Sequence, residues 1–281
     1  MSRSVTPIGS VGQLRRHPVK SMLGERIDRA VITPGGLERD RDWALINVET
    51  GMVASAKQPR LWRDLLRARA TVDGDGVRIG LPDGTVIRGG DPDADDHLSA
   101  FLGRRVRLTD QVPDKASFER ADPDQVLAEG INAEVDMVIG HVGSGSPEPS
   151  FVDFAPIHLV TSSTIAHIGE LGPDGDVAVD RYRPNIVIDA DLPGFAENDW
   201  PGTRLRLGDD VVLEVIALTP RCAVPTLAHG ELPRDTQALR VAATHNRVTP
   251  LDGMGAQPCV GAYATVRGGG TLRLGDAVTI G

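Results

Sequence analysis

The sequence Val215-Ile-Ala-Leu-Thr-Pro-Arg-Cys-Ala-Val-Pro-Thr226 begins as an apolar run and is then interrupted by two prolines. An apolar run of this length that ends at a proline is typical of a β-strand entering a loop. The loop presents Arg221 and Cys222 between the two prolines. A neighbouring cation favours the thiolate form of a cysteine, and the thiolate is both a nucleophile and a metal ligand. The alternative is a buried cysteine that packs as a small apolar side chain.

Further segments with strand character lie on both sides of this stretch. They cover residues 26–33, 40–48, 65–72, 76–81, 85–88, 104–108, 154–160, 261–266 and 271–280. Short strands separated by turns indicate a barrel or a sandwich. Helices are expected at 97–102 and, after the N-cap cluster Thr161-Ser-Ser-Thr164, up to about residue 171. A polar segment rich in Pro and Asp, from residue 111 to about 131, is expected to connect two lobes. The sequence therefore predicts an α+β fold that is predominantly β, with a few peripheral helices.

The composition is that of an ordinary globular protein, and it limits the classes of function. The chain has 281 residues, of which 40% are hydrophobic and 25% are charged, so it can bury a sizeable core. The formal net charge of −9 argues against a nucleic-acid-binding surface, which is basic. The chain has only 2 cysteines, which excludes a disulfide-rich scaffold and an iron–sulfur cluster held by four cysteines.

The sequence contains no recognisable targeting or membrane segment. Its first residues, Met1 to Ser10, lack the apolar segment of an export signal. No stretch approaches the roughly 18 consecutive apolar residues expected of a transmembrane helix. We therefore expect a cytoplasmic protein without membrane contact.

Common catalytic and metal-binding motifs are absent from the sequence. It has no H-E-x-x-H or C-x-x-C motif and no G-x-S-x-G nucleophile motif. Catalysis by a cysteine–histidine pair stays open, because His229 and His245 follow Cys222 in the chain. What remains is a set of loop cations from both halves of the chain, namely Lys20, Arg41, Lys57, Arg60, Arg183 and Arg221. Arginine suits bidentate phosphate binding, so together these cations indicate a phosphate-bearing ligand near Cys222, held between the two lobes.

Several motifs of the sequence resemble those of one protein family. The segment Leu14-Arg-Arg-His-Pro-Val-Lys-Ser21 is similar to the opening motif of the MOSC N-terminal β-barrel domain, and residues 37–43 are similar to its next block. The segments Arg181-Tyr-Arg-Pro-Asn-Ile-Val187 and Arg221-Cys222 resemble the two core motifs of the MOSC domain. The ending Gly275-Asp-Ala-Val278 resembles the end of that domain. The sequence most resembles the family of the mitochondrial amidoxime reducing components and their bacterial homologues.

The resemblance implies a fold and a cofactor. An N-terminal β-barrel-like domain over residues 9–125 would pack on a MOSC β-barrel over residues 126–281, with a molybdenum cofactor (Mo-molybdopterin) between them. Cys222 would be the catalytic residue and the protein ligand to molybdenum. The cofactor-binding residues implied by the resemblance are Lys20, Ser21, Arg41, Asp153, Phe154, Ala155, Arg183, Asn185, Pro220, Arg221 and Tyr263. The sequence departs from the family at His17, which replaces a tyrosine, and at Thr219-Pro220, where relatives often have Cys-Ser.

The resemblance also implies an activity, the reduction of small N-hydroxylated substrates by a molybdenum-dependent oxidoreductase. The sequence has no flavin motif and no iron–sulfur ligand set, so the electrons would come from a separate donor such as a ferredoxin, a flavoprotein or a cytochrome b5-like protein. The alternative is a cofactor-binding or sulfur-carrier protein of the same family, with a persulfide on Cys222 and no reductase activity.

Overall fold

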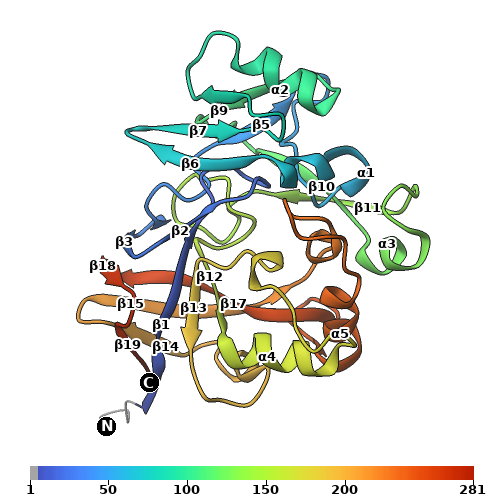
Figure 1. Cartoon of the computed structure of the whole chain (residues 1–281). Helices are drawn as coiled ribbons and strands as arrows, with labels where there is room; N and C mark the ends of the chain where they lie inside the picture. The colour runs from blue at the N-terminus through green and yellow to red at the C-terminus, as the bar shows by residue number, and fades with distance from the viewer. Residues whose placement is uncertain (1–5) are drawn as a thin grey trace.

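The computed structural model describes residues 6–281 and consists of two lobes, one above the other in Figure 1. The first five residues, which belong to the N-terminal segment considered above for an export signal, lie outside the described residues. The upper lobe is drawn mainly in blue to green and the lower lobe mainly in yellow to red. Each lobe is therefore built mostly, but not entirely, from one half of the chain.

The lower lobe is a closed barrel of 7 strands. Its strands, in order around the barrel, are β12 (Ile157–Thr161), β13 (Ile186–Asp189), β1 (Thr6–Arg16), β19 (Ala277–Ile280), β14 (Arg204–Leu207), β15 (Val211–Pro220) and β17 (Gln257–Gly268). Strand β17 pairs with β12 and so closes the barrel. Leucines at alternate positions of β14, Leu205 and Leu207, point into the barrel core, where they pack with Leu213 and Val215 of β15.

Strands tie the two ends of the chain to each other. Although β1 precedes the whole upper lobe in sequence, it pairs with β13 and β19 inside the barrel. The short strand β2 (Glu25–Ile27) pairs with β1. Strand β18 (Gly270–Arg273), which precedes β19, pairs with β3 (Arg29–Thr33), and β3 also pairs with β4 (Gly36–Leu37). The lobes are thus interlocked, and the division of the chain at residue 125 stays a prediction.

The upper lobe contains small sheets and short helices around its own apolar core. Its elements are β5 (Ala44–Asn47) paired with β9 (Val106–Thr109), the sheet β6 (Arg69–Asp73), β7 (Gly76–Gly80) and β8 (Val86–Arg88), and the helices α1 (Pro59–Trp62), η1 (Arg63–Arg67) and α2 (Ala94–Leu102). Leu65, Ile79 and Leu98 are fully buried in this core. The acidic segment predicted to open a helix near residue 97 does so three residues earlier, at Ala94.

The polar segment that was expected to connect the lobes contains regular structure. Strands β10 (Ser117–Ala121) and β11 (Met137–His141) form an antiparallel pair on either side of helix α3 (Pro123–Glu129). The Asp122 side chain accepts hydrogen bonds from two backbone amides of the first turn of α3, at 3.0 and 2.9 Å. The Asp and Pro residues that suggested a loop therefore cap and begin a helix.

The barrel carries the remaining helices on its outside. They are α4 (Ser162–Leu171), η2 (Val179–Arg181), η3 (Ala196–Asp199), η4 (Val224–Thr226) and α5 (Gln237–His245), and a two-residue strand β16 (Arg247–Val248) pairs with β17. The Thr161 side chain caps α4 by accepting from the Thr164 amide at 3.1 Å, as predicted. The fold is mostly β with a few helices, which confirms the predicted fold class. No helix in the described part of the chain is long and apolar enough to cross a membrane.

Candidate functional site

Cys222 lies in a loop that is fixed on both sides. Strand β15 ends at Pro220, and η4 follows two residues after the cysteine. The Arg221 amide donates to the Pro258 carbonyl of β17 at 2.8 Å, and Arg221 Nη2 donates to the Tyr182 carbonyl at 2.9 Å. Cys222 is buried and forms no disulfide. The fold therefore holds this thiol in one place.

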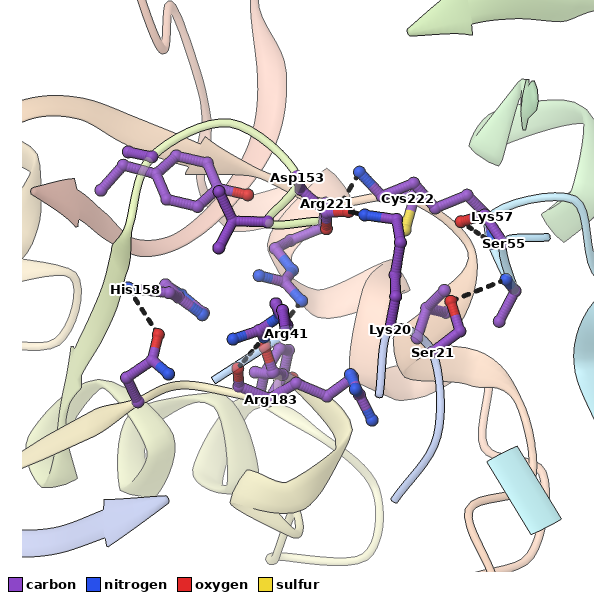
Figure 2. Close-up of a pocket in the computed structure, with 17 residues that line it drawn as sticks. Lys20, Ser21, Arg41, Ser55, Lys57, Asp153, His158, Arg183, Arg221 and Cys222 are labelled. Carbon is purple, nitrogen blue, oxygen red and sulfur yellow. Dashed lines mark hydrogen bonds and ion pairs between the residues drawn. The ribbon is translucent and has the colours of Figure 1, made fainter. Parts of the chain in front are cut away.

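The thiol faces a pocket lined by residues from both lobes, which we call the cationic pocket (Figure 2). The cationic pocket contains about 610 Å³ of space, including its open mouth. The predicted site residues that line it are Lys20, Ser21, Arg41, Asp153, Ala155, Arg183, Asn185, Arg221, Cys222 and Tyr263. Lys57, one of the loop cations expected near Cys222, lines it as well. The lining residues that were not predicted are Ser55, Ala56, Val152, His158, Tyr182 and Val224. Folding thus gathers side chains that are far apart in the chain around one thiol.

Lys20 and Ser21, just after β1, are held by the residues around them. Lys20 Nζ donates to the Phe151 carbonyl at 2.8 Å and to Asp153 Oδ1 at 2.6 Å. Ser21 Oγ accepts from the Ala56 amide at 3.1 Å. Burial outweighs the attraction of Asp153 and lowers the pKa of Lys20 to about 8. Lys20 is thus a buried cation whose charge is only partly compensated.

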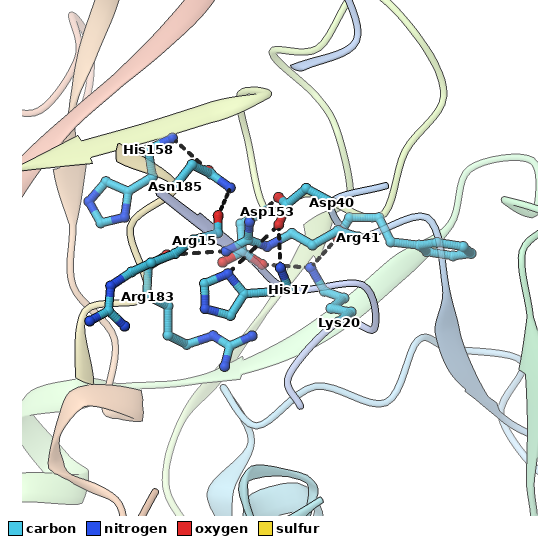
Figure 3. Close-up of polar contacts among 10 residues, drawn as sticks. Arg15, His17, Lys20, Asp40, Arg41, Asp153, His158, Arg183 and Asn185 are labelled. Atoms are coloured by element: carbon cyan, nitrogen blue, oxygen red, sulfur yellow. Dashed lines mark hydrogen bonds and ion pairs between the residues drawn. The ribbon is translucent and has the colours of Figure 1, made fainter. Parts of the chain in front are cut away.

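A chain of polar contacts links Asp40, Arg41 and Arg183 (Figure 3). Arg41 Nη1 pairs with the Asp40 carboxylate, and Arg41 Nη2 donates to the Arg183 carbonyl at 3.3 Å. The other Asp40 oxygen accepts from the His17 amide at 2.7 Å. Arg183 Nη2 is buried and has no hydrogen-bond partner among the described residues. Burial and the nearby Arg41 lower the pKa of Arg183 to about 9. This buried nitrogen could donate to a bound anion.

The backbone of the cationic pocket is strained at three of these positions. Ser21, Arg41 and Arg183 have φ angles of 66°, 56° and 55°, in the left-handed region. Residues other than glycine rarely adopt this region, and each such residue costs on the order of 1–3 kcal/mol. Strain of this kind persists where the surrounding structure requires it, and it gathers at ligand sites. The strain therefore supports a ligand-binding role for this pocket.

The pocket carries an excess of positive charge. Its cations are Lys20, Arg41, Lys57, Arg183 and Arg221, and Asp153 is the one carboxylate among the lining residues. Asp153 bridges Lys20 at 2.6 Å and Lys57 at 3.0 Å. Although burial acts to raise it, the pKa of Asp153 is held well below its usual range by these two ammonium groups. A buried site with this imbalance is suited to a multiply charged anion such as a phosphate.

The inner end of the cationic pocket is built from His158, Asn185 and Tyr263. The Asn185 side chain accepts from the His158 amide at 3.1 Å and donates to the Arg15 carbonyl at 3.5 Å. His158 Nε2 lies 3.3 Å from the Val260 carbonyl. Burial, and then Arg221, lower the pKa of His158 well below its usual value, so the ring is neutral. Asn185 therefore positions β12 against β1, and His158 contributes a neutral polar wall.

Three of the residues singled out in the sequence lie outside the lining of the cationic pocket. Phe154 and Pro220 do not line the cationic pocket but a neighbouring groove. Arg60 points away from the pocket, because it pairs with Glu134 at 3.3 Å on the surface. Lys57, which belongs to the set of loop cations but not to the cofactor-binding residues inferred above, lines both cavities. Lys57 lies in a proline loop three residues before Arg60, and the sequence of that loop did not indicate which way its side chain points.

The cysteine–histidine pair left open above is not formed at this pocket. Neither His229 nor His245 is among its lining residues. His229 Nδ1 lies 2.9 Å from the Leu227 carbonyl, and burial lowers the pKa of His229 to about 4. The described residues also contain no group of three or more His, Cys, Asp or Glu side chains that could hold a metal ion. Cys222 is the one thiol among the lining residues of the cationic pocket.

These features define a class of protein, a two-lobed β protein with a cationic pocket around one buried thiol. Residues 8–112 match the MOSC N-terminal beta barrel domain, and residues 147–279 match the MOSC domain. The chain belongs to the MOSC domain family, which confirms the resemblance stated above.

Named relatives match the chain over most of its length. It is 28% identical over 297 residues to mitochondrial amidoxime-reducing component 1 of Danio rerio. This alignment covers 98% of this chain and 85% of that protein. It is 25% identical over 236 residues to molybdenum cofactor sulfurase of Drosophila grimshawi, covering 75% of this chain and 27% of that protein. Among solved structures, the YuaD protein of Bacillus subtilis aligns with a TM-score of 0.45 at 10% identity, over 99% of this chain and 96% of that chain.

Proposed function

We propose that this protein is a molybdenum-cofactor-dependent oxidoreductase that reduces N-hydroxylated compounds with electrons from a separate donor protein. The observation that carries the proposal is the buried Cys222 thiol in a pocket with five cations and one carboxylate. The names of relatives that span nearly the whole chain refer to the amidoxime-reducing component, and others refer to the molybdenum cofactor.

The residues at the pocket fit a molybdenum–pterin cofactor with a phosphate tail. The unpartnered Arg183 Nη2 and the surplus of cations match a phosphate. A thiolate is a soft ligand suited to a transition metal, and Cys222 is the thiol that lines the pocket. The second cysteine, Cys259, is fully buried elsewhere, and burial raises its pKa to about 12, so it stays protonated. The donor set therefore supports Cys222 as the metal ligand.

The side chains that line the cationic pocket would bind and orient the cofactor. Lys20, Arg41 and Arg183 would hold the phosphate end. Asn185 positions the barrel strand that carries His158, and Tyr263 borders the pocket. When bound, the cofactor supplies the two-electron redox chemistry that these side chains lack. The overall reaction would consume two electrons and two protons and would release water and the N-reduced product. The donor would be a ferredoxin, a flavoprotein or a cytochrome b5-like protein.

The test is metal and pterin analysis of the purified protein, followed by an assay of benzamidoxime reduction with an artificial electron donor. We expect one molybdenum and one pterin per chain, and benzamidine as the product. A fully loaded protein that reduces no N-hydroxylated compound would exclude the activity. A protein without metal or pterin would exclude the cofactor.

A second function, sulfur transfer, is supported by the similarity to molybdenum cofactor sulfurase over 75% of this chain. In that case Cys222 would carry a persulfide, which the cationic pocket would stabilise as an anion. Mass spectrometry of the purified protein separates the two functions. A persulfide on Cys222 in a protein without molybdenum favours the sulfur carrier, and an unmodified cysteine in a molybdenum-loaded protein favours the reductase.

A further inference from the structure

A second concave surface, which we call the apolar groove, lies beside the cationic pocket. It contains about 820 Å³ of space, including its open side. Its apolar walls are formed by Phe118, Val138, Phe154, Ala217, Leu218, Pro220, Pro250, Leu251 and Met254. They come from β10, β11, the segment before β12, β15 and the loop before β17. The groove is therefore a composite of both lobes, as the pocket is.

The apolar groove and the cationic pocket are adjacent and share part of their lining. Lys57, Asp153 and Tyr263 line both of them. Pro220 lines the groove, and Cys222, two residues further along the same loop, lines the pocket. A molecule lying in the groove can therefore place one end beside the pocket that holds the thiol.

The groove exposes apolar side chains that the fold leaves uncovered. Val138, Leu251 and Met254 line it, and 62%, 41% and 43% of their surfaces are exposed. Aromatic rings stand at its inner end, where the centroids of Phe154 and Tyr263 are 5.6 Å apart. Apolar and aromatic walls with a few polar groups at one end are the usual composition of a site for an organic molecule.

The polar groups of the groove disfavour a cation. Lys57, Arg120 and His141 line it, and its one carboxylate, Asp153, is already bridged by Lys20 and Lys57. An amidoxime is uncharged near neutral pH, whereas the amidine formed by its reduction is a strong base and carries a positive charge. The electrostatics of the groove therefore favour binding of such a substrate and release of its product.

We propose that the apolar groove binds the apolar, ring-bearing body of an uncharged N-hydroxylated substrate, while its N–O end reaches the cationic pocket beside Cys222. This inference rests on the proposed reductase function. It assigns substrate selection to Leu251 and Met254 in particular, because they are exposed and contribute little to the core.

The experiment compares benzamidoxime with acetamidoxime, which has the same head group but a methyl group in place of the ring. The molybdenum-loaded double variant Leu251→Ser/Met254→Ser is assayed with an artificial electron donor. We expect the KM for benzamidoxime to rise about 3- to 10-fold because apolar contact area is lost, with kcat unchanged. The KM for acetamidoxime should not change. Leu274→Ser is the matched control, since Leu274 is equally exposed at 41% and lies outside the groove.

An unchanged KM for benzamidoxime, or an equal rise with both compounds, would overturn the proposal. Slower turnover only with a protein donor would also overturn it, by making the groove a docking surface for that donor. If the loaded protein reduces neither compound, the reductase function fails, and calorimetric titration with benzamidoxime then tests the groove alone. Binding that weakens in the double variant but not in Leu274→Ser supports the groove, and no binding to the unmodified protein refutes it.

Discussion

The cationic pocket and the apolar groove share a wall but are built in opposite ways. The pocket is lined by buried charges, held by hydrogen bonds on a strained backbone. The groove is lined by partly exposed apolar side chains. Buried unpaired charge and backbone strain are costly without a ligand, so the pocket suits a group that stays bound. Exposed apolar walls suit a molecule that binds and leaves. The difference supports the two proposed roles, a cofactor held in the pocket and a substrate selected by the groove.

The largest expected effect comes from removing the thiol that the pocket is built around. Cys222→Ala should lower reductase activity more than about 100-fold and reduce the bound molybdenum. Changing a residue that only contacts a metal ligand typically costs about 10- to 100-fold in affinity or activity, and removing the proposed ligand itself should cost more. Metal analysis and the benzamidoxime assay measure both effects. Cys259→Ala is the control, since Cys259 lines neither cavity and its raised pKa keeps it a thiol. Loss of molybdenum in the control variant alone would show that the ligand is misassigned.

The next effect concerns Arg183, whose Nη2 atom has no hydrogen-bond partner among residues 6–281. Arg183→Gln should weaken binding of a phosphate-like anion about 10-fold or more, because a hydrogen bond to a charged group contributes roughly 1.5–3 kcal/mol. The measurement is the rise in melting temperature of the cofactor-free protein with added sulfate, compared with the unmodified chain at equal ionic strength. An equal response in both proteins would mean that Arg183 does not contact the anion.

A smaller effect is expected from pH. The pKa of Lys20 is lowered from 10.5 to about 8, so Lys20 loses its charge in the folded protein as the pH rises through 8. Between pH 8 and 10.5 the unfolded chain binds more protons at this residue than the folded one. The free energy of unfolding of the cofactor-free protein should therefore rise with pH across this interval. Stabilisation by sulfate, whose charge is constant in this range, should fall a few-fold from pH 7 to 9.5. A sulfate response that does not depend on pH would contradict this. Because the pKa of Arg183 is also lowered, to about 9, Lys20→Met should reduce the pH dependence without removing it, and an unchanged pH dependence in that variant would exclude a role for Lys20.

The smallest effect is expected outside both cavities. Arg60 has a side chain that is 47% exposed and pairs with Glu134 on the surface. Arg60→Gln should change the free energy of unfolding by less than about 1 kcal/mol and leave the sulfate response intact. Thermal unfolding with and without sulfate checks this. If sulfate raised the melting temperature of Arg60→Gln as little as that of Arg183→Gln, the cations of the pocket would not differ from surface cations in binding the anion.

The predictions that succeeded from sequence depend on local rules. Alternation of apolar residues marks β14 and β15, and Thr161 caps α4 as its position before an apolar periodic segment requires. A strand that breaks at Pro220 must turn, which places Arg221 and Cys222 in a loop. The resemblance of the motifs to the MOSC family predicted that distant segments meet at one site. Local rules cannot predict such long-range contacts.

Only the tertiary structure decided which side chains meet. Asp153 lines both cavities, whereas its neighbour Phe154 lines only the groove, and a loop sequence carries no periodicity that would distinguish them. Lys57 and Arg60 are three residues apart, yet one faces the pocket and the other a surface carboxylate. The sequence by itself determined a β-rich fold with a thiol beside an arginine. Long-range strand pairing, such as β1 entering the barrel, determined that five cations converge on that thiol, because pairing partners depend on burial over the whole chain.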